Sequence, residues 1–494
     1  MKLYHKWLIL ISIFFGLSTA VLQGQDFKSI EPKKMQKDLT ELLRIIEAHP
    51  DPFTHISEEA FMQRYEETRA SCNTTHSIPE FYRKVAGLVA LIRDGHTSVH
   101  MPEDWLLDLR KKYGGFPYEM YLDNDDRLYV LKNQHSGVIR PGSKVIAING
   151  MATDSFIRAV DPMISHECKP FRNTILDGSF ELYLYLIFGR SDSTLLTCVL
   201  EDTLTTVARN VEYKKWKETE KDSRDLAEKQ IDKGEPYRYD KIDKGVGMIQ
   251  IFSFSVPDLA YYDLFLSKTF TKIRKDSIHS LIIDVRGNFG GWPKVASRMF
   301  HYLTDKHFKT MAMSSMKVSE AYRHNFLERY PRFRFNKTNT RQLSAYYIER
   351  NALLNDPIGS FAIEDQVFNE EPIKEADEFR GDVYLLTNRD SYSAASSFAS
   401  TFQCYGMGVL IGQETGGTKI FRANAMYEQL PGSKLWVAMS TTKLFTACFN
   451  EEMEGIKPTI AYTPSILELV SGLDTQLMFA RKVIKKMQAG KVKN

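Results

Sequence analysis

The C-terminal half of the sequence predicts an α/β fold, in which buried strands alternate with helices. In one stretch, the apolar run at residues 280–284 is followed by a glycine-rich turn and a helix over residues 293–303. In a second stretch, the apolar run at residues 383–386 is followed by a polar turn and by apolar residues at helical spacing. Because α/β sheets place their sites where strands give way to helices, both turns are candidate functional sites.

The second stretch, residues 381–417, places Ser393 just ahead of its helix. A hydroxyl at this position lies beside the first free amide groups of the helix, which favour negative charge developing nearby. Serine is also a preferred N-cap, so a purely structural role is the alternative. The chain contains no Gly-x-Ser-x-Gly sequence, which argues against an α/β-hydrolase.

Composition indicates a globular protein. The chain has 494 residues, of which 43% are hydrophobic and 26% are charged, which is enough for two or three domains with sizeable cores. Its formal net charge of +3, from 65 basic and 62 acidic residues, implies no nucleic acid or anionic membrane partner. The five cysteines are too few and too scattered for a disulfide framework, and at least one must lack a partner within the chain.

The N-terminus predicts export. Lys2 and Lys6 precede an apolar run at residues 7–17, and small residues follow at 18–20. This pattern is typical of a secretory signal peptide, here residues 1–25, because the run is too short to span a bilayer comfortably. An uncleaved membrane anchor is the alternative. No later stretch is apolar enough to cross a membrane, so we expect a periplasmic or extracellular protein without a stable membrane span after cleavage.

Residues 26–110 predict a helical subdomain, because apolar residues recur at helical spacing in three successive segments. The third segment opens at Pro79 and ends near Gly95, a residue suited to a helix C-terminus. His96 is therefore expected in a turn just past a helix. Asp94 and Thr97 could hydrogen-bond its ring and fix one tautomer, although a lone histidine is more often structural than chemical.

Residues 115–212 change to short strands, near 128–131 and 145–148, with Gly-x-x-x-Pro-Gly between them and Ile-Asn-Gly after the second. This order resembles a PDZ domain, a module that binds extended peptide ends by adding a strand to a sheet edge. A generic β-module is the alternative. The aromatic-rich residues 162–190 fit the pattern poorly and are interpreted as an insertion. The charge-dense residues 213–245 indicate a solvated linker or an exposed helix at a domain boundary.

The α/β pattern begins at residue 246 and extends over the remainder, residues 246–494, with a polar insertion at about residues 310–375. Its glycine-rich turn ends in Gly290 and Gly291 and is not a G-x-G-x-x-G sequence. No Gly-Lys-Ser/Thr occurs either, so a nucleotide phosphate site is unsupported. The free amides of the two glycines could instead bind an oxyanion, and a turn that serves only tight packing is the alternative.

Four separated segments, in this order and at these distances, resemble the C-terminal-processing (tail-specific) peptidases and their tricorn-protease relatives over residues 30–465. The segments are Asp94-Gly-His-Thr97, the PDZ-like block, Asp284-Val-Arg-Gly-Asn-Phe-Gly-Gly291, and Ser391-Tyr-Ser-Ala-Ala395 with Gly412-Gln-Glu-Thr-Gly-Gly417. The resemblance implies a crotonase-like ββα catalytic core, a PDZ-like β-domain and an N-terminal helical subdomain. It implies no metal and no organic cofactor.

The family contains two catalytic arrangements. In the tail-specific branch the base is a lysine in a Thr-x-Gly-Lys-Gly turn, but here Thr418 occupies that position and Lys419 is displaced by one residue. In the tricorn-like branch the base is a histidine from the N-terminal helical region, which His96 matches. A glutamate shortly before a Gly-Val/Ile-x-Pro turn supports that histidine, and Glu452 matches it, with Glu454 close enough to compete.

The tricorn-like branch implies a role for each residue. Ser393 would attack the scissile carbonyl, His96 would remove its proton, and Glu452 would orient the imidazole. The amide of Ala394 and that of Gly290 or Gly291 would hold the oxyanion. Lys419 remains the alternative base and Glu454 the alternative acid.

Two departures from the family concern the details of the site: Ser396 stands where the family often has glutamate, and Pro458-Thr459 replaces the usual Pro-Asp. The sequence thus predicts an exported serine endopeptidase that acts on peptides or on the C-terminal ends of unfolded proteins. A non-catalytic protein that binds peptides or apolar ligands on the same scaffold is the alternative. The distance between Ser393 and His96 discriminates between them.

Overall fold

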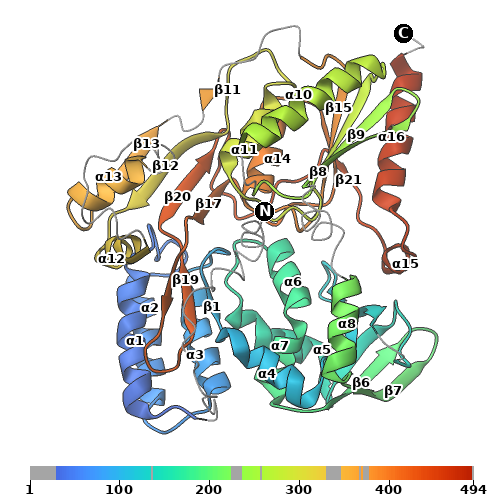
Figure 1. Ribbon diagram of the computed structural model, residues 1–494. Coiled ribbons are helices and arrows are strands. Elements are labelled where there is room, and N and C mark those ends of the chain that lie inside the picture. Colours follow the sequence, from blue (N-terminus) through green and yellow to red (C-terminus); the bar gives the residue numbers. More distant parts are fainter. Residues whose placement is uncertain are drawn as a thin grey trace.

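The computed structural model describes residues 29–134, 137–223, 236–255, 259–329, 347–365, 369–370 and 378–491. The expected signal peptide lies outside the described residues. The molecule has an upper half built around a mixed sheet and a lower half that contains the N-terminal helices and a second sheet (Figure 1). The chain returns to the lower half near its C-terminal end, where strand β19 lies beside the blue N-terminal segment (Figure 1).

The N-terminal part is helical, as the periodicity predicts. Its elements are α1 (Pro32–Ile46), α2 (Glu58–Ser71), α3 (Ile78–Ala90), β1 (Ser98–His100) and α4 (Glu103–Tyr113). Ser77 caps α3 through a reciprocal capping box with Glu80. Strand β1 pairs antiparallel with β19 (Trp436–Met439), which pairs in turn with β18 (Met426–Gln429). The helical subdomain is therefore joined by backbone hydrogen bonds to a hairpin from the far end of the chain.

The second sheet of the lower half is antiparallel and has the strand order β2-β3-β4-β6-β7. Its strands are β2 (Tyr118–Leu122), β3 (Leu128–Asn133), β4 (Lys144–Ile148), β6 (Ser193–Val199) and β7 (Thr203–Arg209), with β5 (Met151–Ala152) paired to β4. Its helices are α5 (Thr153–Val160), the short helix η1 (Asp161–Met163), α6 (Lys169–Gly178) and α7 (Phe180–Phe188). Residues 162–190 therefore contain two helices, α6 and α7, and their buried aromatic side chains contribute to the core.

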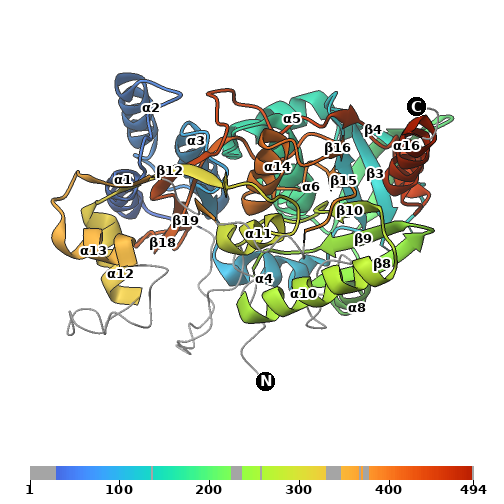
Figure 2. The same cartoon turned by 90° about the horizontal axis from the view of Figure 1, so that it is seen from above.

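The upper half is built on a six-stranded sheet of order β21-β16-β15-β10-β9-β8, parallel except for β8. The strands are β8 (Tyr237–Asp243), β9 (Val246–Ile251), β10 (Ser280–Asp284), β15 (Asp382–Thr387), β16 (Val409–Gly412) and β21 (Ile460–Ala461). Because side chains alternate along a strand, Leu281 and Ile283 face one side, and Ile282 faces the other. Helices α10 (Leu259–Lys275), α11 (Pro293–Phe300) and α14 (Ala394–Cys404) cover the first face, and α16 (Thr475–Lys491) covers the second (Figure 2).

Two expectations about the boundaries of this half are corrected. Residues 213–245 were expected to be a solvated linker or an exposed helix; they include the helix α8 (Tyr213–Ser223), but also the edge strand β8, which was not expected. Residues 310–375 were expected to lie over the core as an insertion, but β12 (Met311–Lys317) is an inner strand of a sheet of order β13-β12-β20-β17. Strand β12 lies inside its sheet because β20, from the C-terminal part of the chain, pairs with it, which local periodicity does not reveal.

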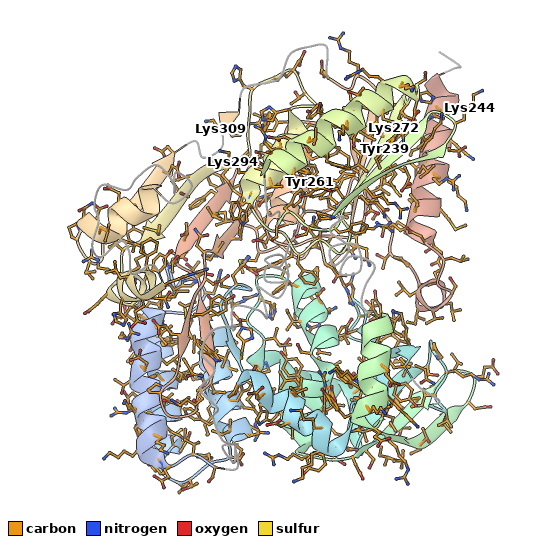
Figure 3. The ribbon with its side chains drawn as sticks, in the orientation of Figure 1. Tyr239, Lys244, Tyr261, Lys272, Lys294 and Lys309 are labelled. Carbon is orange, nitrogen blue, oxygen red and sulfur yellow. A yellow bond between two sulfur atoms is a disulfide. The ribbon has the colours of Figure 1, made fainter. Side chains whose placement is uncertain are left out.

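The remaining elements are β11 (Phe308–Lys309), α12 (Glu320–Arg329), α13 (Tyr347–Asn355), β13 (Phe361–Asp365), β14 (Asn369–Glu370), β17 (Ile420–Ala423), β20 (Thr442–Thr446) and α15 (Ile466–Val470). A disulfide joins Cys404 at the end of α14 to Cys448 after β20, and the other three cysteines are buried and free. No helix among the described residues has the length and apolar character needed to cross a membrane. Lys272 of α10 lies over the ring of Tyr239, on the outer surface of the upper half (Figure 3).

Candidate active site

The two strand–turn–helix stretches come together because β10 and β15 are parallel neighbours. Asp284 is in register with Leu386, so both strands end at the same edge of the sheet. The turn after β10 leads to Gly290, and the turn after β15 leads to Ser393. Cross-links hold the two turns together, since Gly287 donates its amide to the Asn388 side chain at 3.0 Å. This edge is where open α/β sheets place their sites.

Ser393 has a strained backbone. Its φ of 53° and ψ of −120° place a residue with a Cβ in a region that glycine normally occupies. It occupies the N-cap position of α14, yet its side chain caps no amide of the helix. The hydroxyl is instead partly exposed between buried neighbours. Ser393 therefore does not cap α14 through its side chain, and the strained turn directs its hydroxyl away from the helix.

His96 reaches this hydroxyl from the other half of the molecule. Its Nε2 lies 3.1 Å from the Ser393 Oγ, although 297 positions separate the two residues in the sequence. Burial lowers the pKa of His96, and the nearby Asp94 opposes that shift. The imidazole is consequently neutral at neutral pH, the state in which a histidine can accept a proton.

The position of His96 depends on a strand from the C-terminal part of the chain. His96 lies between α3 and β1, and β1 pairs with β19 from Ser98↔Ala438 to His100↔Trp436. Next to it, the Thr97 hydroxyl accepts the backbone amide of Ser440 at 3.1 Å. The hairpin of β18 and β19 extends from the upper half into the lower half beside β1 (Figure 1). It therefore fixes the histidine-bearing turn relative to Ser393.

Two backbone amides close to Ser393 in the sequence or in the neighbouring turn, those of Ala394 and Gly291, have no hydrogen-bond partner in the described chain. Both were predicted as oxyanion donors. The third candidate, Gly290, donates its amide to the Asn288 side chain at 2.8 Å and is therefore already engaged. Gly290 has a packing role instead, because a Cβ added there would lie 2.7 Å from the Ser393 Cβ and 2.8 Å from the Ala394 nitrogen.

Replacing Gly290 with alanine is expected to lower kcat by at least about 10²-fold, comparable with the loss of one oxyanion donor. The added methyl group must displace Ser393 or the Ala394 amide, and the φ of +104° disfavours any side chain. The measurement is kcat on a fluorescently labelled denatured protein. Gly287→Ala is the matched control, because its φ of +69° imposes backbone strain while no atom lies within 4 Å of the added Cβ. Equal losses in both variants would contradict the packing argument.

The predicted acids are not brought to His96. Glu452 is exposed, and its carboxylate accepts a hydrogen bond from the Asn450 side chain at 2.6 Å. Glu454 is exposed as well and pairs with Lys457. The reason is the anchoring of the turn that follows, where Glu414 binds the Gly455 amide at 2.7 Å. That contact holds the segment against the loop at residues 414–417 and leaves both predicted acids facing solvent.

Lys419 is not brought to the nucleophile either. Lys419 lies directly before β17 and is half-buried. Its backbone carbonyl accepts a hydrogen bond from the Thr446 amide at 3.0 Å. No hydrogen bond joins its Nζ to Ser393 in the part of the chain that the structure describes. Thr418, which occupies the lysine position of the tail-specific branch, is buried and donates its hydroxyl to the Ile420 carbonyl.

The group that does contact the second ring nitrogen of His96 was missed by the sequence analysis. The Tyr392 hydroxyl lies 2.8 Å from the Nδ1 of His96, and the two rings stack with centroids 4.7 Å apart. Asp94 is also close, with its Oδ1 3.9 Å from the same nitrogen and 3.0 Å from the His96 amide. The only sequence signal for Tyr392 was its position next to Ser393.

A serine on a strained turn, a neutral histidine within hydrogen-bond reach and two unengaged amides define a serine hydrolase site on an α/β core. Residues 245–462 match the Peptidase family S41 model. This match covers the α/β part of the chain that carries Ser393, and the protein is a serine-type peptidase. The predicted fold class, with a crotonase-like ββα core and a PDZ-like domain, is confirmed. A search of curated protein sequences finds no match.

Solved structures share the fold at low identity. Mature CPAF complexed with lactacystin aligns with a TM-score of 0.63 at 14% identity, over 92% of this chain and 98% of that one. Mature CPAF alone aligns with a TM-score of 0.59 at 13% identity, over 89% and 94%. The photosystem II D1 C-terminal processing protease aligns with a TM-score of 0.42 at 14% identity, over 89% and 98%. At these identities the similarity concerns the fold.

Proposed function

We propose that this peptidase is an exported endopeptidase that cleaves peptides or the C-terminal ends of unfolded proteins, with Ser393 as nucleophile and His96 as general base. The observation that carries the proposal is the 3.1 Å contact between the His96 Nε2 and the Ser393 Oγ. It joins residues from two halves of the molecule. A contact of this length is the geometry that proton transfer between base and nucleophile requires.

The chemistry follows from these atoms. The Ser393 Oγ attacks the scissile carbonyl as its proton passes to the His96 Nε2. The carbonyl oxygen, now negatively charged, is stabilised by the Ala394 and Gly291 amides. His96 then returns the proton to the leaving amine, and an acyl group remains on Ser393. A water molecule, deprotonated by His96, hydrolyses this ester and restores the enzyme.

The preference for peptide ends is supported by the contacts between the PDZ-like domain and the nucleophile loop. Arg389 donates to the Leu122 carbonyl at 2.6 Å and pairs with Asp177 of α6. The neighbouring Asp390 accepts the Thr174 hydroxyl at 2.6 Å. The domain that would bind an extended peptide by strand addition is thus in direct contact with the loop that carries Ser393. Export is supported by the disulfide between Cys404 and Cys448, since disulfides persist in oxidising compartments.

A fluorophosphonate probe tests the proposal. We expect the full-length protein to be labelled once, and peptide mapping to place the label on Ser393, because only a serine activated by a base reacts readily. The label should be absent in Ser393→Ala. If the intact protein is not labelled and still binds peptides or apolar ligands, the non-catalytic alternative replaces the peptidase. Cleavage of a denatured protein at internal or C-terminal bonds then assigns the substrate class.

A further inference from the structure

We propose that Tyr392 and Glu167 are positioning residues for His96, and that the protonation state of Glu167 sets which ring nitrogen of His96 carries the proton. The inference rests on the proposed function, because it concerns the same serine and histidine. It replaces the predicted acid, Glu452, with a buried tyrosine and a carboxyl group from the lower half of the molecule.

Tyr392 is held rigidly against His96. It is 3% exposed, and the Phe171 ring of α6 stacks on its other side with centroids 3.9 Å apart. Its hydroxyl lies 2.8 Å from the His96 Nδ1. A tyrosine hydroxyl carries one hydrogen, so it either accepts the Nδ1 proton or donates its own. The direction of this hydrogen bond therefore decides whether the proton of the neutral imidazole is on Nδ1 or on Nε2.

Glu167 lies close to that hydroxyl. Its side chain is 1% exposed, and neither carboxyl oxygen has a hydrogen-bond partner in the described chain. A Cβ added at Gly95 would lie 2.5 Å from the Tyr392 hydroxyl and 2.8 Å from the Glu167 Oε2, so both groups border the same small space. A buried carboxyl group without a partner is costly. The Tyr392 hydroxyl borders this carboxyl across the space at Gly95, and the amides of Gly95 and Glu167 are the other donors near it.

The two states of Glu167 have opposite consequences. When Glu167 is ionised it can only accept, so Tyr392 donates to it and accepts the Nδ1–H of His96. The Nε2 is then free to take the Ser393 proton, which is the productive tautomer. When Glu167 is protonated it can donate to Tyr392, which then donates to Nδ1. The His96 proton moves to Nε2, where it prevents the ring from acting as a base.

The surrounding charges place this switch near neutral pH. Burial and the charge of Asp94 raise the pKa of Glu167 to about 8, against the opposing effects of its own amide, the Gly95 amide and Arg422. Asp94 stays ionised, because His49 at 3.4 Å helps to hold the pKa of this buried carboxyl low. Burial raises the pKa of Cys168 and, well above 10, that of Tyr392, so neither ionises near pH 8. The last titratable group in this cluster is His96, whose pKa is lowered by burial.

The sign of the pH dependence follows. With His96 alone, the rate would level off above the ordinary histidine pKa of about 6.5. With the relay, the rate continues to rise as Glu167 ionises, by about 10-fold between pH 7 and a plateau above pH 9. The test measures the rate constant for fluorophosphonate labelling of the full-length protein, together with kcat and KM on a labelled denatured protein, from pH 6 to 9.5.

Three variants test whether Glu167 and Tyr392 cause the rise in rate with pH. Glu167→Gln should make the rate constant independent of pH between 7 and 9, because the amide does not titrate. Tyr392→Phe should do the same and lower kcat by about 10²-fold with KM unchanged, since the base loses its orienting partner. Asp177→Asn is the control: burial raises the pKa of this carboxyl to about 7, but it contacts Arg389 and not His96. This variant should retain the rise.

A second measurement uses the wild-type protein and so does not require any variant to fold. In the wild-type protein labelled with ¹⁵N-histidine, NMR should show the His96 proton on Nε2 at pH 7 and on Nδ1 at pH 9. A wild-type rate that is flat above pH 7, a rise that persists in Glu167→Gln, or one tautomer at both pH values would overturn the relay. The proposed function fails separately, by absence of labelling on Ser393 at every pH.

Discussion

Replacing Ser393 with alanine will abolish hydrolysis of a denatured protein, with kcat falling by about 10⁶-fold, while the fold is retained. The expected magnitude is that seen when the nucleophile of a serine hydrolase is removed, because no other group can form the acyl-enzyme. Stability should change little, since the Ser393 hydroxyl caps no helix amide and its carbonyl still accepts from Ser396 at 2.8 Å. The measurements are the rate of cleavage and the thermal unfolding curve of the variant.

Ser400→Ala is the matched control for this experiment. Ser400 lies in the same helix, α14, is 3% exposed and bonds Thr446 at 3.0 Å, so its replacement removes a buried hydroxyl without touching the site. This variant should cleave the substrate at a rate close to that of the wild type. Full activity in Ser393→Ala would exclude Ser393 as the nucleophile.

Replacing His96 and Lys419 separately will have very different effects. His96→Gln is expected to lower kcat by about 10⁶-fold, as loss of the base does in serine hydrolases. Lys419→Ala is expected to leave it near the wild-type value, because no hydrogen bond joins this amine to Ser393 within the described residues. The comparison uses the same cleavage assay, with circular dichroism to show that each variant is folded.

The reverse result would assign the chain to the Ser–Lys arrangement of the tail-specific branch. In that case the loop at residues 414–419 would have to rearrange, since the Gly416 amide is bound to the Ser391 carbonyl at 3.0 Å. A partial loss in both variants would contradict a single general base. Only the pattern in which His96 is indispensable and Lys419 is not agrees with the geometry of the site.

The sequence predicted those parts of the site that depend on local pattern. The strand at Ser280–Asp284 and the serine before α14 follow from short apolar runs bounded by glycine and polar residues. His96 was identified because the motif around it resembles one family branch. In each case the signal comes from residues that are close together in the sequence, where periodicity and motif are informative.

The parts that were missed depend on contacts between distant segments. Glu452 matches a motif, but a motif does not determine which way a side chain faces, and the anchoring of Gly455 by Glu414 turns it to solvent. Tyr392 and Glu167 border the same space at Gly95 because α6 packs against the loop that carries Tyr392, and the segment that holds Glu167 was interpreted as an insertion. Strand β12 was missed for the same reason, since its partner β20 comes from a distant part of the chain.

The pairing of β1 with β19 also determines when the enzyme becomes active during its biosynthesis. Chains are made from the N-terminus, so the segment that carries His96 emerges from the ribosome before the segment that carries Ser393. The strand partner of the first segment, Trp436–Met439, and Ser393 are synthesised later. No nascent fragment that stops before β19 holds the histidine turn in its final place. Catalytic competence therefore requires that synthesis has passed both Ser393 and β19.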